Sequence, residues 1–146
     1  MQVRLKRNNN AVHFTATNES GQSIELDGSP EIGGENLGVR PMENLLMSLG
    51  GCSGIDIQLI LKKQRQTADS LEITITSERQ KDVTPALFQD IHVLFTVTGE
   101  LDESKLIKAV DLSMQKYCSV AKILEKSSSI HYTIELNGAL LSAKSQ

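Results

Sequence analysis

Short segments of alternating hydrophobic and polar residues open the chain. They cover residues 3–6, 12–17 and 23–26, and the turn-forming run Asn8-Asn9-Asn10 separates the first two. Alternation of this length is typical of half-buried β-strands. We therefore expect three N-terminal strands, followed by a glycine-rich loop over residues 27–40.

The longest apolar region runs from residue 41 to about residue 66. Pro41 suits the first position of a helix, and apolar residues then recur on nearly every side of the helical period. A helix of this kind is expected to be buried on all sides. Because it would be about 36 Å long, more than one small sheet can cover, we expect a second subunit to help bury it.

Three glycines interrupt this helix, at Gly50, Gly51 and Gly54. Each costs about 1 kcal/mol relative to alanine in a helix interior. The simplest compensation is the close approach of another stretch of backbone around Cys52, which lies between them.

The second half of the chain mixes strands and helices. Residues 71–78 and 88–98 alternate and predict a hairpin, and Asp102 is expected to cap a helix reaching about residue 115. A shorter helix should follow Cys118, then a last strand over 130–136 and a frayed tail over 138–146. This order predicts a single α+β domain over residues 1–146 with mostly antiparallel pairing.

Composition and charge exclude several function classes. The net charge is −3, lysine and arginine are scattered, and aromatic residues make up 3% of the chain, so nucleic acid is not an expected partner. The chain shows no N-terminal signal pattern and no uninterrupted membrane-length apolar run. We expect no membrane association and a cytoplasmic location, where thiols stay reduced.

The two cysteines are the main candidates for chemistry. Cys118 precedes a predicted helix start, a setting that lowers a thiol pKa, whereas Cys52 lies inside a helix and would need tertiary neighbours to activate it. Asp56, one turn after Cys52, would raise that thiol's pKa unless a cation pairs with it. Alternatively, it serves as a cap or forms a salt bridge with Lys62, Lys63 or a neighbouring element. Both cysteines are also compatible with a purely structural role as small buried hydrophobes.

Three histidines, His13, His92 and His131, are dispersed over separate predicted strands. With the two cysteines they show none of the spacing of a zinc site. We therefore expect no metal and no cofactor.

Two segments carry a family resemblance. They are Arg-Pro-Met-Glu-Asn-Leu-Leu-Met-Ser-Leu-Gly-Gly-Cys-Ser-Gly-Ile-Asp-Ile-Gln-Leu-Ile-Leu-Lys-Lys-Gln-Arg-Gln at 40–66 and Ala-Val-Asp-Leu-Ser-Met-Gln-Lys-Tyr-Cys-Ser-Val at 109–120. Together they resemble the OsmC/Ohr family of thiol-dependent hydroperoxide reductases, most closely its YhfA-like branch, and the resemblance extends from Val3 to Leu136. It implies an intertwined homodimer of α+β subunits, with antiparallel sheets around long buried central helices.

The resemblance also implies an activity and a partner. Cys52 would attack an organic hydroperoxide and become a sulfenic acid, and Cys118 would condense with it to a disulfide. An external dithiol, for example of lipoyl type, would reduce the disulfide by exchange. This is an antioxidant role in an oxidative stress response. Four apolar residues would line the substrate pocket or equally belong to the core: Leu45, Leu46, Met47 and Leu49.

Two departures from the family pattern bear on that activity. Family peroxidases carry a glutamate ten residues before the first cysteine, and Met42 stands there in this chain. Glu43 follows one position later, rotated by about 100° on the helix, where it would either serve the site or simply favour the helix N-terminus. The activating arginine would be Arg7 or Arg40, each of which also fits a surface charge.

Two other functions therefore stay open for the sequence. One is a non-catalytic member that keeps the family pocket and binds a small molecule. The other is a redox sensor or sulfur carrier, in which the disulfide itself is the signal or the carrier.

Overall fold

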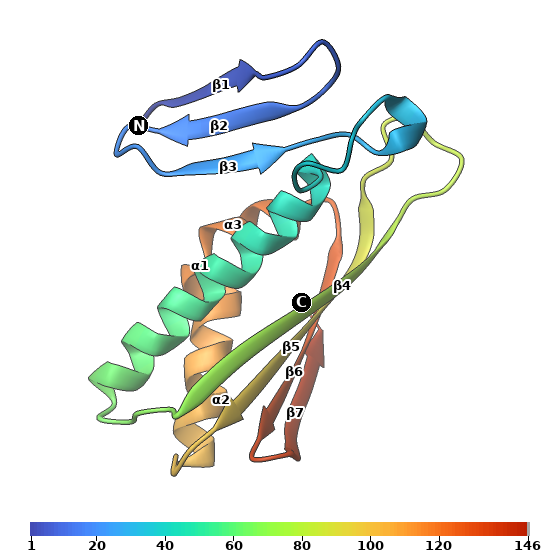
Figure 1. Cartoon of the computed structure of the whole chain (residues 1–146). Coiled ribbons are helices and arrows are strands. Elements are labelled where there is room, and N and C mark those ends of the chain that lie inside the picture. Colours follow the sequence, from blue (N-terminus) through green and yellow to red (C-terminus); the bar gives the residue numbers. More distant parts are fainter. Residues whose placement is uncertain (146) are drawn as a thin grey trace. The chain divides into compact units, whose positions relative to one another are not determined.

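The computed structural model describes residues 1–145, which form two compact units joined within helix α1: residues 1–47, and the chain from residue 48 onward. Figure 1 shows the helices and strands in chain order. They are β1 (Val3–Arg7), β2 (Phe14–Asn18), β3 (Ser23–Leu26), the 3-10 helix η1 (Pro30–Ile32), α1 (Pro41–Lys63), β4 (Ser70–Arg79), β5 (Phe88–Thr98), α2 (Glu103–Leu112), the π-helix η2 (Ser113–Tyr117), α3 (Ser119–Leu124), β6 (Ser129–Leu136) and β7 (Ala139–Ser145). The α+β class expected from the sequence is confirmed.

The N-terminal unit contains an antiparallel sheet in the order β1-β2-β3. Its register aligns Leu5, Ala16 and Ile24 across the three strands, so these side chains share one face. Arg4 aligns with Thr17 on the opposite face. The sheet therefore has one apolar and one polar face, as the alternation in the sequence predicts.

The loop after β3 is organised around one buried carboxylate. Asp27 accepts hydrogen bonds from the backbone N–H groups of Gly28 (2.7 Å), Glu35 (2.9 Å) and Leu37 (3.0 Å). These donors stabilise the charged form, the bond from Leu37 most of all, and hold the pKa of Asp27 below its ordinary value. One side chain thus ties together both ends of a glycine-rich segment.

The C-terminal unit contains a four-stranded sheet in the order β4-β5-β6-β7. The hairpin β4-β5 and the pair β6-β7 are antiparallel, whereas β5 and β6 are parallel because the helices between them form a crossover. The C-terminal part of α1 and the crossover helix α2 lie on one face of this sheet (Figure 1). That face supplies the buried strand residues Ile91, Val93, Phe95, Val97, Ile130, Tyr132, Ile134 and Leu136.

The expected frayed tail is wrong for the described residues 139–145. They form β7, which pairs with β6 through a turn at Asn137 (φ 50°) and Gly138 (φ 82°). An Asn-Gly pair with positive φ at both positions is the preferred two-residue hairpin turn. This dipeptide was the signal in the sequence for β7, the strand that was not predicted.

The expectation that α1 is buried on all sides does not hold for the single chain. Its buried residues form one stripe at four-residue spacing: Leu49, Ser53, Ile57 and Leu61. Ile55 and Leu59 on another side are 64% and 53% exposed. By length and mean hydropathy α1 could also cross a membrane, but core helices of soluble proteins meet the same criteria, and Glu43 and Asp56 interrupt its apolar run.

The glycines of α1 face side chains, contrary to the expected close approach of backbone. A Cβ added at Gly54 would lie 3.0 Å from Cδ1 of Ile73, and one at Gly50 would lie 3.4 Å from Cδ1 of Ile75, both on β4. A Cβ at Gly51 would meet nothing within 4 Å. Two of the three glycines therefore let α1 settle close to the β4 isoleucines.

We predict that Asp27→Asn loosens the loop over residues 27–40, because an amide nitrogen cannot accept the N–H bonds that the carboxylate accepts. Since the folded-state pKa is lowered, the carboxylate's contribution is complete above its unfolded pKa of about 4. It is lost as the pH falls through the lower folded-state pKa. Amide exchange of Glu35 and Leu37 should be faster in the variant at pH 7, and the difference in unfolding midpoint from wild type should shrink on acidification. Glu35→Gln, an exposed carboxylate of the same loop, is the control; equal exchange in all three proteins would contradict the prediction.

We predict that Gly138→Ala destabilises the protein by about 1–2 kcal/mol, the cost of a left-handed conformation for a residue with a Cβ. A Cβ at this position meets no atom within 4 Å, so the effect should come from the backbone alone. Urea unfolding measures it. Gly138→Asn should lie closer to wild type, because asparagine tolerates this conformation, and equal losses in the two variants would argue against backbone strain.

Candidate active site

Two sulfurs and a carboxylate come together in the C-terminal unit. Sγ of Cys52, Sγ of Cys118 and a carboxylate oxygen of Asp56 all lie within 4.8 Å of one another. Both cysteines are free thiols; Cys52 is half-buried and Cys118 is fully buried. The structure therefore juxtaposes two thiols that are far apart in the sequence, one of them accessible and the other enclosed.

Helix α1 positions the first part of this cluster. Cys52 and Asp56 lie four residues apart and so occupy neighbouring turns of one face. Ser53 is buried beside them, and its hydroxyl donates to the carbonyl of Leu49 at 2.8 Å, which satisfies its polar group within the helix. A serine in this buried stripe leaves more room for a neighbouring element than leucine or isoleucine would.

The π-helix η2 positions Cys118. The helical chain of α2 continues into a wider turn, closed by the Cys118 N–H donating to the carbonyl of Ser113 at 2.8 Å. The chain then leaves the helical conformation at Cys118, which caps α3 by accepting the Ala121 N–H on its Sγ at 3.4 Å. The predicted helix start after Cys118 is confirmed; the π turn, a feature frequent at functional sites, was not foreseen.

Ser113 links the two helices that carry the cysteines. Its buried hydroxyl lies 3.3 Å from the carbonyl oxygen of Ser53 and 3.4 Å from a carboxylate oxygen of Asp56, both of which can accept its proton. Sequence reasoning did not single out Ser53 or Ser113 as site residues. The available signal was that each serine falls on the buried face of its helix. Ser113 lies three residues after Val110, and Ser53 lies four residues after Leu49.

A second polar contact fixes the π turn on the sheet. Tyr132 of β6 donates its hydroxyl to Asp111 at 2.9 Å and accepts from the side chain of Gln115 at 3.1 Å. Burial, reinforced by the Asp111 carboxylate, raises the pKa of Tyr132 to about 12. These two hydrogen bonds join the end of α2, through Asp111, and η2, through Gln115, to strand β6.

The enclosed position of Cys118 controls its acidity. Burial, with a smaller contribution from the neighbouring Cys52, raises the pKa of the Cys118 thiol to about 12, despite the lowering effect of the Ala121 N–H. The helix start therefore does not produce the low pKa expected from the local sequence. Cys118 is a neutral thiol at physiological pH, because desolvation outweighs one hydrogen bond.

The other candidate residues lie in the N-terminal unit. Glu43 accepts the backbone N–H of Arg40 at 2.9 Å, which caps the start of α1. The Arg40 guanidinium donates to the carbonyl of Asp27 at 3.2 Å and to the side chain of Asn36. Arg7 ends β1, in register with Phe14, on the apolar face of the sheet. The parts that these three residues play at the thiol cluster stay predictions.

The histidines do not join the cysteines within the described residues. His13 bonds Glu25 at 2.7 Å in the N-terminal unit, and His92 stacks on His131 with ring centroids 4.8 Å apart in the C-terminal sheet. The predicted pairing of Asp56 with Lys62 or Lys63 is also not found: Asp56 forms no salt bridge within residues 1–145.

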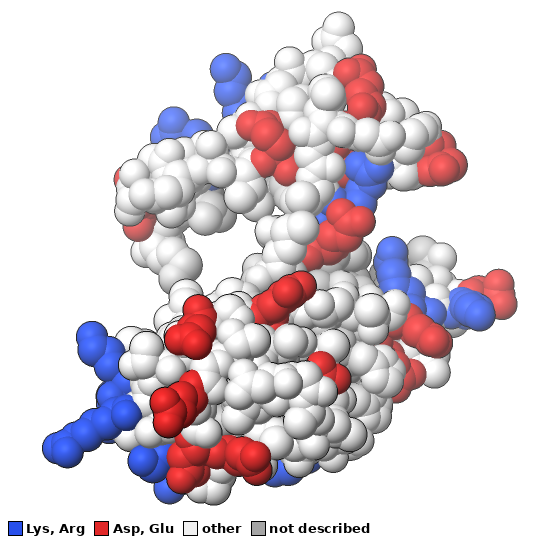
Figure 2. All heavy atoms as spheres, turned by 60° about the horizontal axis from the view of Figure 1, so that its bottom comes forward, with Lys and Arg blue, Asp and Glu red and all other residues white. Residues whose placement is uncertain are grey.

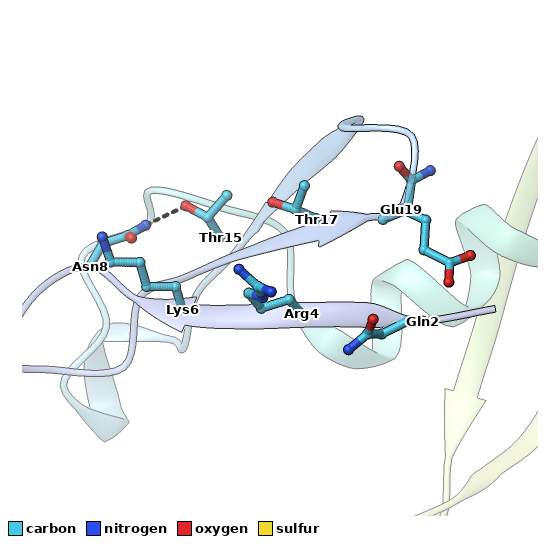
Figure 3. Close-up of a pocket in the computed structure, with 8 residues that line it drawn as sticks. Gln2, Arg4, Lys6, Asn8, Thr15, Thr17 and Glu19 are labelled. Atoms are coloured by element: carbon cyan, nitrogen blue, oxygen red, sulfur yellow. Dashed lines mark hydrogen bonds between the residues drawn. The ribbon is translucent and has the colours of Figure 1, made fainter.

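A hollow of about 530 Å³ lies on the polar face of the N-terminal sheet. Arg4, Lys6, Thr15 and Thr17 rise into it from β1 and β2, as Figure 3 shows. None of the residues that line it is a cysteine. On the face in Figure 2, basic and acidic side chains are scattered among uncharged ones and form no continuous basic stripe.

Comparison with known proteins identifies a matching family, a close relative and structures of the same fold. Residues 33–133 match the family model described as OsmC-like protein. The chain is 41% identical over 140 residues to Protein YhfA of Escherichia coli K12, covering 95% of this chain and all of that protein. It superposes on a crystal structure from Aquifex aeolicus VF5 with a TM-score of 0.81 and 32% identity, over 93% of this chain and 95% of the other.

A more distant structure shares the fold alone. It is an organic hydroperoxide resistance protein from Legionella pneumophila, with a TM-score of 0.70 and 12% identity over 92% of this chain and 97% of that one. The family model matches more than half of the chain, and YhfA is related to it over nearly its full length. The chain therefore belongs to the OsmC-like protein family.

Proposed function

We propose that the protein is a cysteine-based peroxidase that reduces organic hydroperoxides. The observation that carries the proposal is the pair of free sulfurs within 4.8 Å, one half-buried on α1 and one enclosed at the start of α3. Membership of a family that includes an organic hydroperoxide resistance protein supports the substrate class.

In the proposed reaction the Cys52 thiolate attacks the outer oxygen of the hydroperoxide ROOH. The O–O bond breaks, ROH leaves after taking a proton, and Cys52 becomes a sulfenic acid. The Cys118 thiol then attacks the Cys52 sulfur, which forms the disulfide and releases water. An external dithiol, for example of lipoyl type, reduces the disulfide and is itself oxidised. The sum is ROOH plus dithiol giving ROH, water and oxidised dithiol.

The difference in exposure between the two thiols supports the order in which they react in this proposal. A peroxide can reach Cys52, which is half-buried, whereas Cys118 has no exposed surface. A thiol with a pKa of about 12 is also a poor first nucleophile, because the thiolate is the attacking species. Cys118 suits the second step, because its target, the oxidised sulfur of Cys52, lies within 4.8 Å.

The proposed attack by Cys52 calls for a nearby cation, because positive charge favours the thiolate form of a cysteine. Of the two arginines considered, Arg40 is already bound to loop oxygens, whereas Arg7 is a charge placed among apolar neighbours on the sheet face. We propose Arg7 as the activating residue. In this proposal the main role of Glu43 is to cap α1, and pairing with the arginine is secondary.

Uncovered apolar surface supports the proposed homodimer. Val3, Leu5 and Ile24 on the N-terminal sheet are 63%, 54% and 43% exposed, and Ile55 and Leu59 on α1 are exposed as well. Apolar surface of this kind marks an interaction site. A second copy of the chain, placed over α1, would bury the residues that the single subunit leaves uncovered. We also propose a cytoplasmic location, where a dithiol reductant keeps both thiols reduced.

The peroxidase proposal predicts a rapid intramolecular disulfide. Stoichiometric cumene hydroperoxide added to the reduced protein should remove two hydrogens from the intact mass. Peptide mapping should locate a Cys52–Cys118 crosslink, formed faster than with hydrogen peroxide. Cys118→Ser should stop at a Cys52 sulfenic acid that a dimedone-type reagent traps, because the resolving thiol is missing. Cys52→Ser should neither oxidise rapidly nor crosslink.

The same experiment separates the alternatives. Thiols that oxidise only at the rate of free cysteine would refute the peroxidase and favour a binding protein. A disulfide that forms rapidly but is not recycled by any dithiol would favour a redox sensor.

The dimer proposal predicts that Ile55→Glu yields monomers. An unpaired charge buried in an interface costs about 3–5 kcal/mol, which weakens the dimer by more than about a hundredfold. Light scattering coupled to size exclusion measures the mass. Leu140→Glu is a matched control, because Leu140 on edge strand β7 is 65% exposed and Ile55 is 64% exposed. A monomeric wild type, or equal behaviour of both variants, would exclude α1 as the interface.

A further inference from the structure

The cluster contains a charge that the disulfide chemistry does not use. Asp56 is half-buried, forms no salt bridge within residues 1–145, and directs a carboxylate oxygen to within 4.8 Å of both sulfurs. Its one hydrogen-bond donor in the described chain is the Ser113 hydroxyl at 3.4 Å. Two sulfurs and a carboxylate oxygen gathered in this way form a donor set that suits a metal cation.

We propose that reduced Cys52 and Cys118, together with Asp56, form a binding site for a thiophilic divalent cation of the zinc class. The site goes beyond the peroxidase function, and its existence does not depend on that function. It would hold the protein in a reduced, peroxide-resistant state, because both sulfurs would be engaged by the metal.

The geometry suits this cation. In a tetrahedral zinc site, Zn–S bonds of about 2.3 Å and Zn–O bonds of about 2.0–2.2 Å separate the ligand atoms by roughly 3.5–3.8 Å. The three ligand atoms here are mutually within 4.8 Å, so shifts of about an ångström or less complete the site. Two sulfurs favour zinc over calcium or magnesium, which bind through six or more oxygens.

The surroundings supply the outer contacts that such sites use. The Ala121 N–H donates to Sγ of Cys118, and the Ser113 hydroxyl can donate to Asp56, so two of the three ligands are already oriented. Cys52 and Asp56 are both half-buried, which leaves a path for the cation and a place for water as fourth ligand.

Binding and oxidation compete for the same sulfur electrons. Coordination replaces the two S–H protons, which pass to solvent, and yields two thiolates and one carboxylate around a dication. Disulfide formation removes both thiolates and with them two of the three ligands. The metal-bound and disulfide forms therefore exclude each other.

The test is a titration of chelator-treated, reduced full-length protein with Zn²⁺ in competition with a chromophoric chelator. Co²⁺ serves as a second probe, since its sulfur-to-metal charge-transfer band reports thiolate ligation. We expect one Zn²⁺ per chain and a Co²⁺ band. Asp56→Asn should weaken Zn²⁺ binding by at least tenfold, since loss of even an outer-shell partner costs about 10–100-fold. Glu72→Gln, an exposed carboxylate on β4, should bind as wild type does.

The wild-type sequence provides a control that does not depend on folding of variants. Protein oxidised to the Cys52–Cys118 disulfide should lose Zn²⁺ binding and the Co²⁺ band, and regain both on reduction. No binding by the reduced protein, equal binding by Asp56→Asn and wild type, or equal binding by oxidised and reduced protein would each overturn the proposal. Since peroxide-driven crosslinking is measured separately, failure of the metal site leaves the peroxidase proposal intact, and the reverse also holds.

Discussion

The close crossing of α1 by the π turn η2 is the contact on which the site depends. Ser53 and Ser113 meet there, and small buried side chains on both elements let them approach until a hydroxyl reaches the neighbouring backbone carbonyl. Larger residues at either position would separate the helices and move the sulfurs apart. The distance between two cysteines remote in sequence is therefore set by serines rather than by the cysteines themselves.

The same crossing creates an electrostatic conflict. It encloses Cys118 and raises the pKa of its thiol, while it brings a carboxylate beside Cys52. A low-dielectric cluster that gathers ionisable groups of one sign is stable only when some of them stay protonated or a positive charge joins them. The proposed arginine and the proposed metal are two ways to supply that charge, in the catalytic and the resting state respectively.

Local patterns in the sequence were sufficient for most of the fold. Alternation located β4 and β5, and Asp102 was correctly identified as a cap, accepting the Lys105 N–H at 3.0 Å. The Asn137-Gly138 pair is also a local signal, for the β6-β7 hairpin, although a frayed tail was expected there. The sequence could not predict the π turn, nor decide between a reactive and an enclosed Cys118, because both depend on packing against α1 and β6, and no local period encodes such packing. One chain buries only part of the apolar surface of α1, and burial of the rest by a second subunit stays a prediction.

The sequence separation of the two cysteines has a consequence for folding. Cys52 precedes the β4-β5 hairpin and Cys118 follows the crossover helix, so a bond between them would enclose the first half of the four-stranded sheet. Closing a loop of roughly 70 residues removes about 4 kcal/mol of chain entropy from the unfolded state. By linkage, the native fold would favour the oxidised pair to the same extent. Resistance to unfolding would then fall as the supply of reductant rises, and the oxidised chain would outlast the reduced one under proteolysis.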